Sequence, residues 1–588
     1  MTEYRCTRLT IPAPTISAPT AAPGSAATEE APRRLELWYL APSSPSFNAG
    51  DENDCSLYLT PDNSADGQPC QPVTLPVATT SPSFRRLSID LPAEHGGSFT
   101  LSGPGMARLR GVCLFQPDRV LEDGVQWLML DGEPARPGNR GPGNPWALHL
   151  APPMGWMNDP NGLFFDGTRY HVFYQHSPNS YHAQNMHWGH AVSDDMLHWR
   201  HLPVALTPHA GVVEKPHFKD GAFSGSAVVD ADGRQWLFYT RHQNLDSRRP
   251  DLAMHEWQVR AELKDGWHTG PEQPVIAGLP ATDMGQDFRD PWVFKGPDGR
   301  WKCLIGGQHG AHRMVYLYQS PDLLRWSYAG ILWESDAWSA HPAECPAFFP
   351  LGDKWVLVLS MCLNDEPSRT AAGMVAGDGW PVVAFVGTFD GRRFTEETHQ
   401  KLDLGPHFYA ASIMQRDNDR GDGEALCMAW AHNWAFEDHG RPLASCQTLP
   451  RRLSLGANGH IISQPLAGLA DLRQSEITGL ESGTDISAFT AIECVMTLAE
   501  TPLDVHITAK DGHQTRLNWS GETLAILEDG HETLARRLPT GSARLFLDHN
   551  LLELFAGDGE AVLTLRLATE TGPARLTAPG DVTAYPLA

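Results

Sequence analysis

The sequence predicts an all-β protein, made of a five-bladed β-propeller, a C-terminal β-sandwich and an additional small N-terminal β-domain. Helical periodicity is scarce along the 588 residues, and short apolar runs bounded by Gly, Pro, Asp and Asn are frequent, which is typical of strands joined by turns. In the middle of the chain one such segment recurs about every 60 residues, a length that suits the four strands of one propeller blade. The last part of the chain has strand-like runs without this repeat.

The part of the chain before the repeat is expected to hold one small domain. Residues 1–34 are rich in Pro, Ala, Thr and Ser, so we expect them to be disordered or loosely attached. Residues 35–133 alternate short apolar runs with polar turns and predict a small β-domain. Residues 134–145 contain several Gly and Pro and are expected to form a linker.

The repeat that predicts the propeller joins a turn containing Gly and Asp to an apolar strand. Its five copies predict five blades over residues 146–455. A second motif, Ser193–Trp199, recurs as Ser320–Trp326 at about twice the interval, and unrelated hairpins would not keep two motifs in such regular spacing. The five copies begin at Asp166, Asp232, Asp298, Gly352 and Asp422.

The chain changes character after the repeat. Residues 456–465 match neither neighbouring region, and we expect a second linker there. Residues 466–588 contain strand-like runs separated by turn residues, which predicts a C-terminal β-sandwich.

Composition excludes several classes of partner. The net charge of −25 and the absence of a basic stripe argue against nucleic-acid binding. No run of 18 apolar residues is present, so no membrane span is expected. The ten cysteines form no metal-ligand spacing and fit reduced thiols. Because no signal peptide is recognisable either, a cytoplasmic location is expected, and a homo-oligomer is left open.

Three carboxylates converge in the predicted propeller. The first strand of each blade lines the central channel, so residues at equivalent places on these strands meet there. Seven or eight residues upstream of the first four turns stand Asp159, Ser224, Asp290 and Glu344. Acids held together without a metal are costly, which indicates a function. Glycoside hydrolysis uses one carboxylate as a nucleophile or base and a second carboxyl group as an acid. A third carboxylate can stabilise the transition state.

The sequence neighbours of these acids suggest how they differ. Arg289 is expected to keep a neighbouring carboxylate ionised, and apolar residues around Glu344 are expected to raise its pKa, as a general acid requires. No metal and no cofactor are expected, because the pair His187 and His190 lacks a third ligand.

The chain resembles glycoside hydrolase family 32, which comprises invertases, inulinases, levanases and sucrose-6-phosphate hydrolases. The resemblance spans roughly residues 146–588. It implies that Asp159 is the nucleophile, that Glu344 is the acid/base, and that Asp290 binds furanose hydroxyls. It also implies a fructose subsite lined by Asn158, Gln175, Trp188, Phe223, Ser224 and Arg289. The motifs that carry it are Trp156–Gly162, Phe173–Gln175, Met186–His190, Phe223–Ala227, Phe288–Pro291, Glu344–Cys345, Phe408–Ala410, Leu449–Arg451 and Glu553–Gly559.

Three departures from the family pattern concern the substrate more than the reaction. Ala183 stands where the family usually has Trp, and His407 where it often has an acid. Residues 35–133 are not part of the common core. The first two departures leave the leaving-group preference open.

The expected activity is retaining, exo-acting hydrolysis of terminal β-D-fructofuranosyl units in sucrose and short fructo-oligosaccharides. Fructosyl transfer and hydrolysis of the fructans inulin or levan remain open. An inverting arabinofuranosidase or xylosidase with the same fold and a binding module without catalysis are the more distant alternatives.

Overall fold

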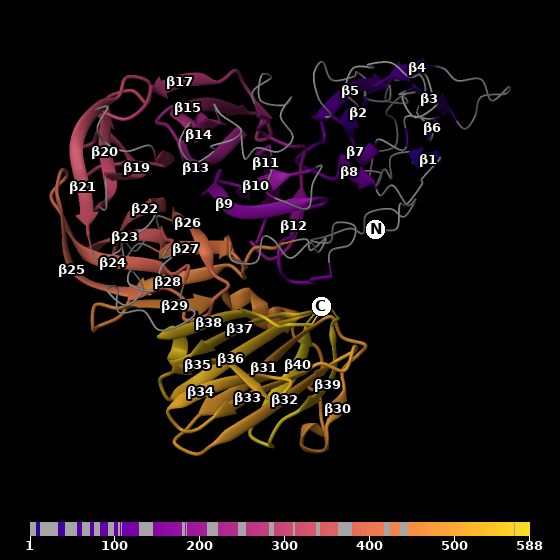
Figure 1. The fold of residues 1–588 in the computed structure, drawn as a ribbon, viewed down its shortest axis with the longest axis vertical. Helices are drawn as coiled ribbons and strands as arrows, with labels where there is room; N and C mark the ends of the chain where they lie inside the picture. Colours follow the sequence, from indigo (N-terminus) through magenta and orange to yellow (C-terminus); the bar gives the residue numbers. More distant parts are fainter. Residues whose placement is uncertain are drawn as a thin grey trace, which may run out of the picture.

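The structure is a computed structural model that consists almost entirely of β-strands (Figure 1). Within the described residues, helical structure is limited to short 3-10 turns, including η4 (Ala467–Leu472), η5 (Leu480–Ser482) and η6 (Gly557–Gly559). The expected all-β class is therefore confirmed. None of the helices described is long or apolar enough to span a bilayer. The described residues are 8–11, 33–41, 56–61, 71–75, 83–91, 99–103, 106, 109–128, 145–178, 183, 185–208, 221–244, 254–280, 287–309, 312–336, 342–362, 379–416, 424–434, 445–569 and 571–587.

Five antiparallel sheets follow one another through the middle of the chain. The first contains β9 (Trp156–Phe165), β10 (Tyr170–Ser177), β11 (His187–Ser193) and β12 (Trp199–His201). The second contains β13 (Gly221–Val229), β14 (Gln235–Asn244), β15 (Met254–Lys264), β16 (His268–Thr269) and β17 (Gln273–Ile276). The third contains β18 (Phe288–Lys295), β19 (Trp301–His309), β20 (His312–Ser320) and β21 (Ser327–Ser335). The fourth contains β22 (Ala343–Leu351), β23 (Lys354–Met361), β24 (Val382–Phe389) and β25 (Phe394–Lys401), and the fifth contains β26 (Tyr409–Arg416), β27 (Glu424–Trp430), β28 (Arg451–Leu455) and β29 (Ile461–Pro465).

The first strands of these five sheets form an inner ring. Strand β9 contacts β13, β13 contacts β18, β18 contacts β22, β22 contacts β26, and β26 contacts β9 again. The other strands of each sheet lie progressively further out (Figure 1). Residues at equivalent places on the inner strands therefore approach one another, although they are far apart in the sequence.

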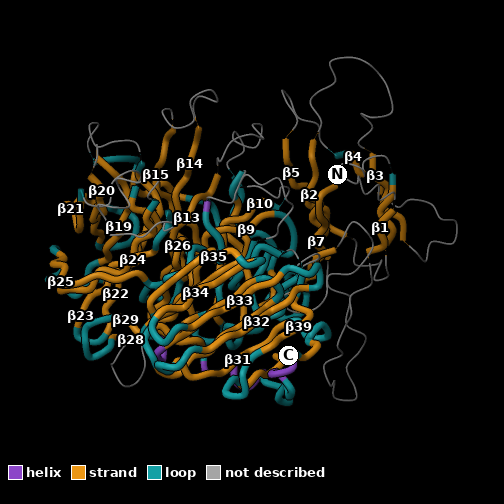
Figure 2. Tube along the Cα trace, turned by 60° about the horizontal axis from the view of Figure 1, so that its bottom comes forward, coloured by secondary structure: helices purple, strands orange, loops and turns teal. Residues whose placement is uncertain are grey.

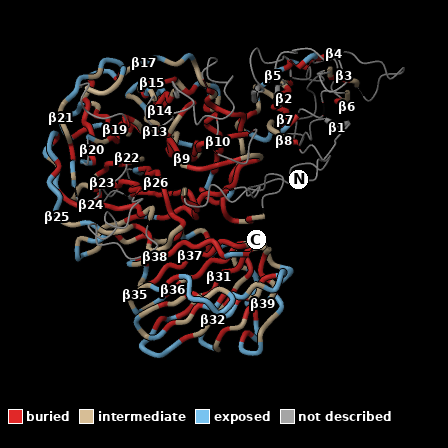
Figure 3. The backbone as a smooth tube through the Cα atoms, viewed as in Figure 1, coloured by how far each residue is buried: buried red, intermediate tan, exposed pale blue. Residues whose placement is uncertain are grey.

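The second strands of the sheets are largely buried on both faces because each sheet packs between two others. Strand β23, for example, is buried from Val356 onward, and the burial map shows buried chain throughout the interior of the ring (Figure 3). The repeated turns need glycine, since Gly233 and Gly299 have φ of 77° and 73°, a region that other residues rarely adopt.

Two expected boundaries differ from the structure. Residues 456–465 were expected to be a linker, yet Ile461–Pro465 is the outer strand of the fifth sheet and pairs with β28. The turn at Gly456–His460 closes the hairpin of β28 and β29, so these residues connect two strands of one sheet. Residues 1–34 were expected to be loose, yet β1 (Arg8–Ile11) pairs with β6, and β2 already begins at Arg33.

The N-terminal region forms two four-stranded sheets around a common core. A second apolar cluster joins them to the first sheet of the ring, with Trp38 and Trp127 packed near Val192 and Leu202. Residues 134–144 lie outside the described part of the chain. The two sheets contain β1 (Arg8–Ile11), β6 (Phe99–Ser102), β3 (Ser56–Pro61) and β4 (Gln71–Thr74), and β5 (Ser83–Leu91), β2 (Arg33–Ala41), β7 (Leu109–Phe115) and β8 (Val125–Leu128).

The C-terminal region forms two further sheets that share one apolar core, and they lie beside the ring (Figure 2). The six-stranded sheet contains β30 (Thr484–Asp485), β39 (Pro573–Thr577), β32 (Leu503–Ala509), β33 (Gln514–Trp519), β34 (Thr523–Glu528) and β35 (His531–Arg537). The five-stranded sheet contains β38 (Ala561–Arg566), β37 (Leu551–Ala556), β36 (Gly541–Asp548), β31 (Ala491–Leu498) and β40 (Thr583–Leu587), with β38 nearest the ring (Figure 1).

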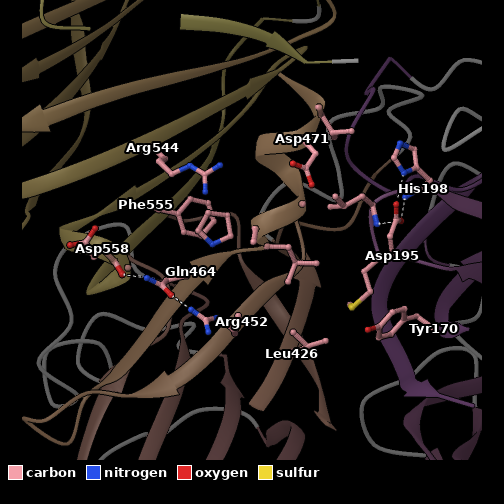
Figure 4. A pocket seen from close by; sticks show the side chains of 18 of the residues that line it. Tyr170, Asp195, His198, Leu426, Arg452, Gln464, Asp471, Arg544, Phe555 and Asp558 are labelled. Atoms are coloured by element: carbon pink, nitrogen blue, oxygen red, sulfur yellow. Dashed lines mark hydrogen bonds and ion pairs between the residues drawn. The ribbon is translucent and has the colours of Figure 1, made fainter. Parts of the chain in front are cut away.

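A cavity of about 800 Å³ separates part of the ring from the C-terminal sheets. Figure 4 shows Tyr170 and Asp195 on one side of this cavity, and Arg544 and Asp558 on the other. None of the three predicted acids lines it, so the candidate site lies elsewhere.

Candidate active site

The structure places on the inner ring the four residues that stand seven or eight positions before their turns. Asp159 lies on β9, Ser224 on β13, Asp290 on β18 and Glu344 on β22. At each place the pairing with the next strand is interrupted by a register shift. Such β-bulges bend a strand and redirect a side chain. The bulges therefore explain how the inner strands direct these side chains towards a common centre.

The backbone is strained at two of these bulges and at a further one on β26. Asp290, Cys345 and Ala410 have φ of 65°, 47° and 52°, in the left-handed region that non-glycine residues seldom adopt. Each strained residue follows directly on the inner strand after Arg289, Glu344 or Tyr409. Strain of this kind persists where the surrounding structure enforces it, and it is frequent at functional sites.

Asp159 is held by Asn158 on its own strand and by Ser224 on β13. Ser224 donates to its Oδ2 over 2.7 Å, and Asn158 donates to its Oδ1 over 3.1 Å. Burial raises the pKa of Asp159 to about 6; the hydrogen bond from Ser224 opposes the rise, while the negative charge of Glu344 adds to it. The side chain of Asn158 is fixed in turn, since its Oδ1 accepts from Trp156 Nε1 over 2.9 Å.

Asp290 is linked to Asp159 through Cys345. The amide of Cys345 donates to Asp290 Oδ2 over 2.8 Å, while its thiol lies 3.7 Å from Asp159 Oδ2. Burial raises the pKa of Asp290 to about 7 against the attraction of Arg289, and Glu344 and Asp159 add to the rise. The three acids therefore interact electrostatically and form one cluster.

Glu344 lies between a guanidinium and a phenol. Arg289 Nη2 donates to its Oε1 over 2.9 Å, and Tyr409 Oη donates to its Oε2 over 2.5 Å. The apolar surroundings expected from its sequence neighbours are not found, because strands of the neighbouring sheets supply these two polar partners. Its side chain is 20% exposed, which leaves the carboxylate accessible from the centre of the ring.

Arg289 is the cation of the cluster. Besides Glu344, it contacts Asp287 over 2.5 Å and Glu256 over 3.3 Å. Although burial would raise the pKa of Glu256, Arg289 and His242 lower it to about 2. Arg289 thus keeps a neighbouring carboxylate ionised, as expected for this residue type.

Residues 149–465 match the family described as glycosyl hydrolases family 32, N-terminal domain. The chain belongs to glycosyl hydrolase family 32. A sucrose-6-phosphate hydrolase of Escherichia coli is 35% identical over 71% of this chain and 88% of its own length. A raffinose invertase of Escherichia coli is 32% identical over 74% of this chain and 92% of its own.

Solved structures agree with this membership. The Bombyx mori GH32 β-fructofuranosidase BmSUC1 is 30% identical, covers 75% of this chain and 93% of its own, and superposes with a TM-score of 0.64; a mutant of it was solved in complex with sucrose. A family 32 structure from Bifidobacterium adolescentis, 22% identical, shares the fold over 99% of both chains with a TM-score of 0.77. The predicted enzyme class, a glycoside hydrolase with β-fructofuranosidase activity, is confirmed for this family 32 member.

Not all residues of the expected fructose subsite face the centre. Trp188 is fully buried and donates through Nε1 to the carbonyl of Phe223 over 3.1 Å, so it supports Phe223 from behind and does not line the subsite. The Phe223 ring is partly exposed and stacks on His242 at 4.1 Å. Gln175 is 2% exposed, and its amide has no hydrogen-bond partner among the described residues.

Tyr409 is the main site residue that the analysis of turn spacing missed. It begins the fifth inner strand and contacts Glu344, but it stands further upstream of its turn than the four predicted residues do. The Phe408–Ala410 motif of family 32 was the signal available. Thr240 was also missed; its Oγ accepts from the strained amide of Asp290 over 2.9 Å.

The two departures from the family 32 pattern lie in different surroundings. His407 is buried, and its Nδ1 accepts from the amide of Arg566 over 3.1 Å, so it faces the C-terminal sheets. Ala183 is 2% exposed and packs in the apolar cluster that contains Trp156 and Met186.

The inner strands leave little space beyond the acids. A small cavity of about 20 Å³ is lined by Asp290, by Cys345 and by residues that follow Asp159, Asp290 and Tyr409 on their strands, such as Asn161, Trp292 and Ser412. This volume is sufficient for about one water molecule. A sugar therefore does not fit into this cavity below the acids.

Proposed function

We propose that this family 32 enzyme is a retaining, exo-acting β-fructofuranosidase that hydrolyses sucrose and short fructo-oligosaccharides. Asp159 attacks the anomeric C2 of a terminal β-D-fructofuranosyl unit while Glu344 protonates the departing oxygen. Glu344 then removes a proton from water, which attacks C2, releases Asp159 and yields fructose with retained configuration. Asp290 binds furanose hydroxyls and stabilises the oxocarbenium-like transition state.

The contact of Cys345 with both Asp159 and Asp290 carries this proposal. It supports a cluster in which three acids from separate sheets act on one sugar ring, since Glu344 directly precedes Cys345. The different partners support different roles. Asp159 is held by hydrogen bonds in a fixed orientation, as a nucleophile requires. Glu344 instead contacts the guanidinium of Arg289 and the phenol of Tyr409, which can respond when Glu344 loses or gains a proton.

The fold assigned to this mechanism is a five-bladed β-propeller followed by a β-sandwich. The closed ring of inner strands and the five successive sheets support the propeller; the extent of its fifth sheet moves its end from residue 455 to 465. The common core of the two C-terminal sheets supports a sandwich over residues 466–588. The two N-terminal sheets support a separate β-domain ending near residue 133.

The small cavity below the acids supports exo-cleavage. A chain of sugars cannot pass through a cavity of about 20 Å³, which supports a site that receives one end of the chain. Asn158, Ser224, Phe223, Arg289 and Gln175 are proposed to line the fructose subsite. The unpartnered amide of Gln175 supports its inclusion, because a buried amide is costly until a ligand bonds to it. A cytoplasmic location remains part of the proposal.

The test measures glucose and fructose separately while the enzyme acts on sucrose, with Asp159→Ala as control. Release of equal amounts from sucrose indicates hydrolysis, and the proton spectrum of the first product reports retention. An excess of glucose would indicate fructosyl transfer. Absence of both sugars, with sucrose and with sucrose 6-phosphate, would overturn the proposed function.

A further inference from the structure

The segment that leads into Tyr409 covers the edge of the C-terminal five-stranded sheet. Strand β38 is the outermost strand of that sheet, and unpaired groups on such an edge need partners. Here residues 403–407 supply them. The bonds run from Leu404 N to Val562 O (2.7 Å), from Thr564 N to Asp403 Oδ1 (2.9 Å), from His407 N to Thr564 O (3.3 Å) and from Arg566 N to His407 Nδ1 (3.1 Å).

Arg451 lies beneath this segment and joins three parts of the molecule. Its Nη1 donates to Asp403 Oδ2 over 2.9 Å, and its Nη2 donates to Glu553 Oε2 over 2.6 Å. Its guanidinium carbon lies 4.4 Å from the centre of the Phe408 ring. Arg451 is fully buried, so water cannot replace these partners.

Glu553 fixes Arg451 from the sandwich side. Its other oxygen, Oε1, accepts from His149 Nε2 over 3.0 Å and from the amide of Leu449 over 2.7 Å. His149 in turn contacts Asp548 over 2.8 Å through Nδ1. These side chains are completely buried, so Glu553 has a single available geometry, which it imposes on Arg451.

We propose that Glu553 is a positioning residue for Tyr409, through which the sandwich sets the orientation of Glu344. The path is short: Glu553 bonds Arg451, Arg451 stacks on Phe408, and the next residue donates to Glu344 over 2.5 Å. The inference deepens the proposed function and rests on Glu344 as the acid/base. It assigns the C-terminal sheets a part in catalysis, although none of their residues reaches the acids.

The groups facing this contact define what must be controlled. Tyr409 faces Glu344, Cys345 and Cys362, and its ring packs edge-on against Trp380 at 5.4 Å. Glu344 faces Arg289, Asp290 and Asp159. None of these groups belongs to the sandwich. A sandwich variant reaches Glu344 through the segment ending at Tyr409, whereas the chain at Leu449, which also bonds Glu553, leads through Gln447 to Asn158 beside Asp159.

The test compares Glu553→Gln with Glu493→Gln. Both glutamates are fully buried in the same five-stranded sheet and pair with arginine, but Glu493 pairs with Arg473 and Arg544, away from residues 403–409. Both variants should lower the melting temperature. Only Glu553→Gln should lower kcat, by about tenfold with little change in KM. It should also move the alkaline limb of the pH–rate profile, where the proposed acid Glu344 loses its proton, to higher pH. The reason is that Tyr409, whose hydrogen bond favours the ionised carboxylate of Glu344, is displaced.

Tyr409→Phe separates the inference from the proposed function. Tyr409→Phe should itself shift the alkaline limb, and adding Glu553→Gln to it should cause no further shift, because coupled residues are not additive. A shift with Tyr409→Phe but not with Glu553→Gln would overturn the positioning role alone, as would equal kinetic effects of Glu493→Gln. No shift with Tyr409→Phe would contradict Glu344 as the acid/base. If Glu553→Gln does not fold, Thr564→Val, which removes hydrogen bonds to Asp403 and Arg451, takes its place with the same expected shift.

Discussion

Arg289 donates to Glu344 through both Nε and Nη2, over 3.2 and 2.9 Å, so the proposed acid/base rests in an ion pair with a residue from the neighbouring sheet. The acid of a retaining glycosidase must hold a proton when substrate binds. Because Arg289 also contacts Asp287 and Glu256, it can keep its own charge balanced while Glu344 gains and loses a proton. The negative charge of Glu344 contributes to the raised pKa of both Asp159 and Asp290, so the ionisation of these two aspartates depends on the same cluster.

Removal of either central acid should abolish turnover without unfolding the chain. Asp159→Ala and Glu344→Ala should each lower kcat for sucrose by roughly 10³-fold or more, because catalytic groups act as a unit. Asp298→Asn, an exposed acid in one of the repeated turns, serves as a control and should retain normal activity. Circular dichroism checks the fold. Turnover close to wild type in either alanine variant would remove the mechanism.

Azide should rescue Glu344→Ala with an activated aryl fructoside. Such a leaving group needs no proton, so a fructosyl-enzyme should form on Asp159, and a small anion can enter the vacated space without a general base. Product configuration and the rate with added azide are the measurements. Inverted product, or no rescue, would contradict the assignment of the two roles.

Activity should fall as the pH decreases through about 6. In the proposed mechanism Asp159 attacks only when ionised. Burial raises its pKa to about 6, so its ionised fraction declines below that pH. Ser224→Ala removes a hydrogen bond that lowers this pKa, and the acidic limb should move to higher pH by about half a unit or more. Ser226→Ala is the matched control, since Ser226 on the same strand donates to the carbonyl of Pro291. An acidic limb that stays in place in Ser224→Ala would be the contrary result.

The sequence predicted the inner ring well because a repeat keeps a constant spacing between its turn and its inner strand. The spacing therefore identified four residues that stand seven or eight positions before their turns: Asp159, Ser224, Asp290 and Glu344. The same spacing did not identify Tyr409, because more residues separate Tyr409 from the fifth turn than separate the other four residues from theirs. Strand β29 was taken for part of a linker because residues 456–465 do not resemble the regions on either side of them, although their hairpin turn at Gly456 and Gly459 leads into a strand.

Contacts between sheets could not be read from sequence neighbours. Ala343 and Pro346 suggested an apolar site for Glu344, whereas Arg289 and Tyr409 reach it from the adjacent sheets. Trp188 stands in a motif of the family, but successive side chains of a strand face opposite sides. Its side chain enters the core between two sheets, a direction that only the register of β10 and β11 reveals.

Stability should depend on pH through His149. Burial alone would lower the pKa of His149, but its hydrogen bonds to Asp548 and Glu553 raise it to about 9. The stabilisation is therefore complete below the unfolded value near 6.5 and is lost as the pH rises through about 9, a change on the order of 3 kcal/mol. His149→Gln should melt at lower temperature at pH 6 and show a flatter dependence between pH 6.5 and 9. His198→Gln, at an exposed pair with Asp195, should keep the wild-type slope; a similar slope in His149→Gln would contradict the charged state.

Sucrose and short fructo-oligosaccharides should be preferred over long inulin or levan. In the proposed cytoplasmic location, the enzyme meets only sugars that a transporter delivers, which are short. The proposed exo-action points the same way, because it removes one unit at a time from a chain end, and the cavity of about 20 Å³ beyond the acids offers no room for further units. The N-terminal sheets also stand against the first sheet, where Trp38 packs edge-on against His187 at 5.3 Å, and we expect them to limit the space for a bulky leaving group on that side. The measurement is kcat/KM for sucrose, kestose, inulin and levan, counted per cleavable chain end. A clear preference for either polymer would overturn the prediction and, with it, the argument from location.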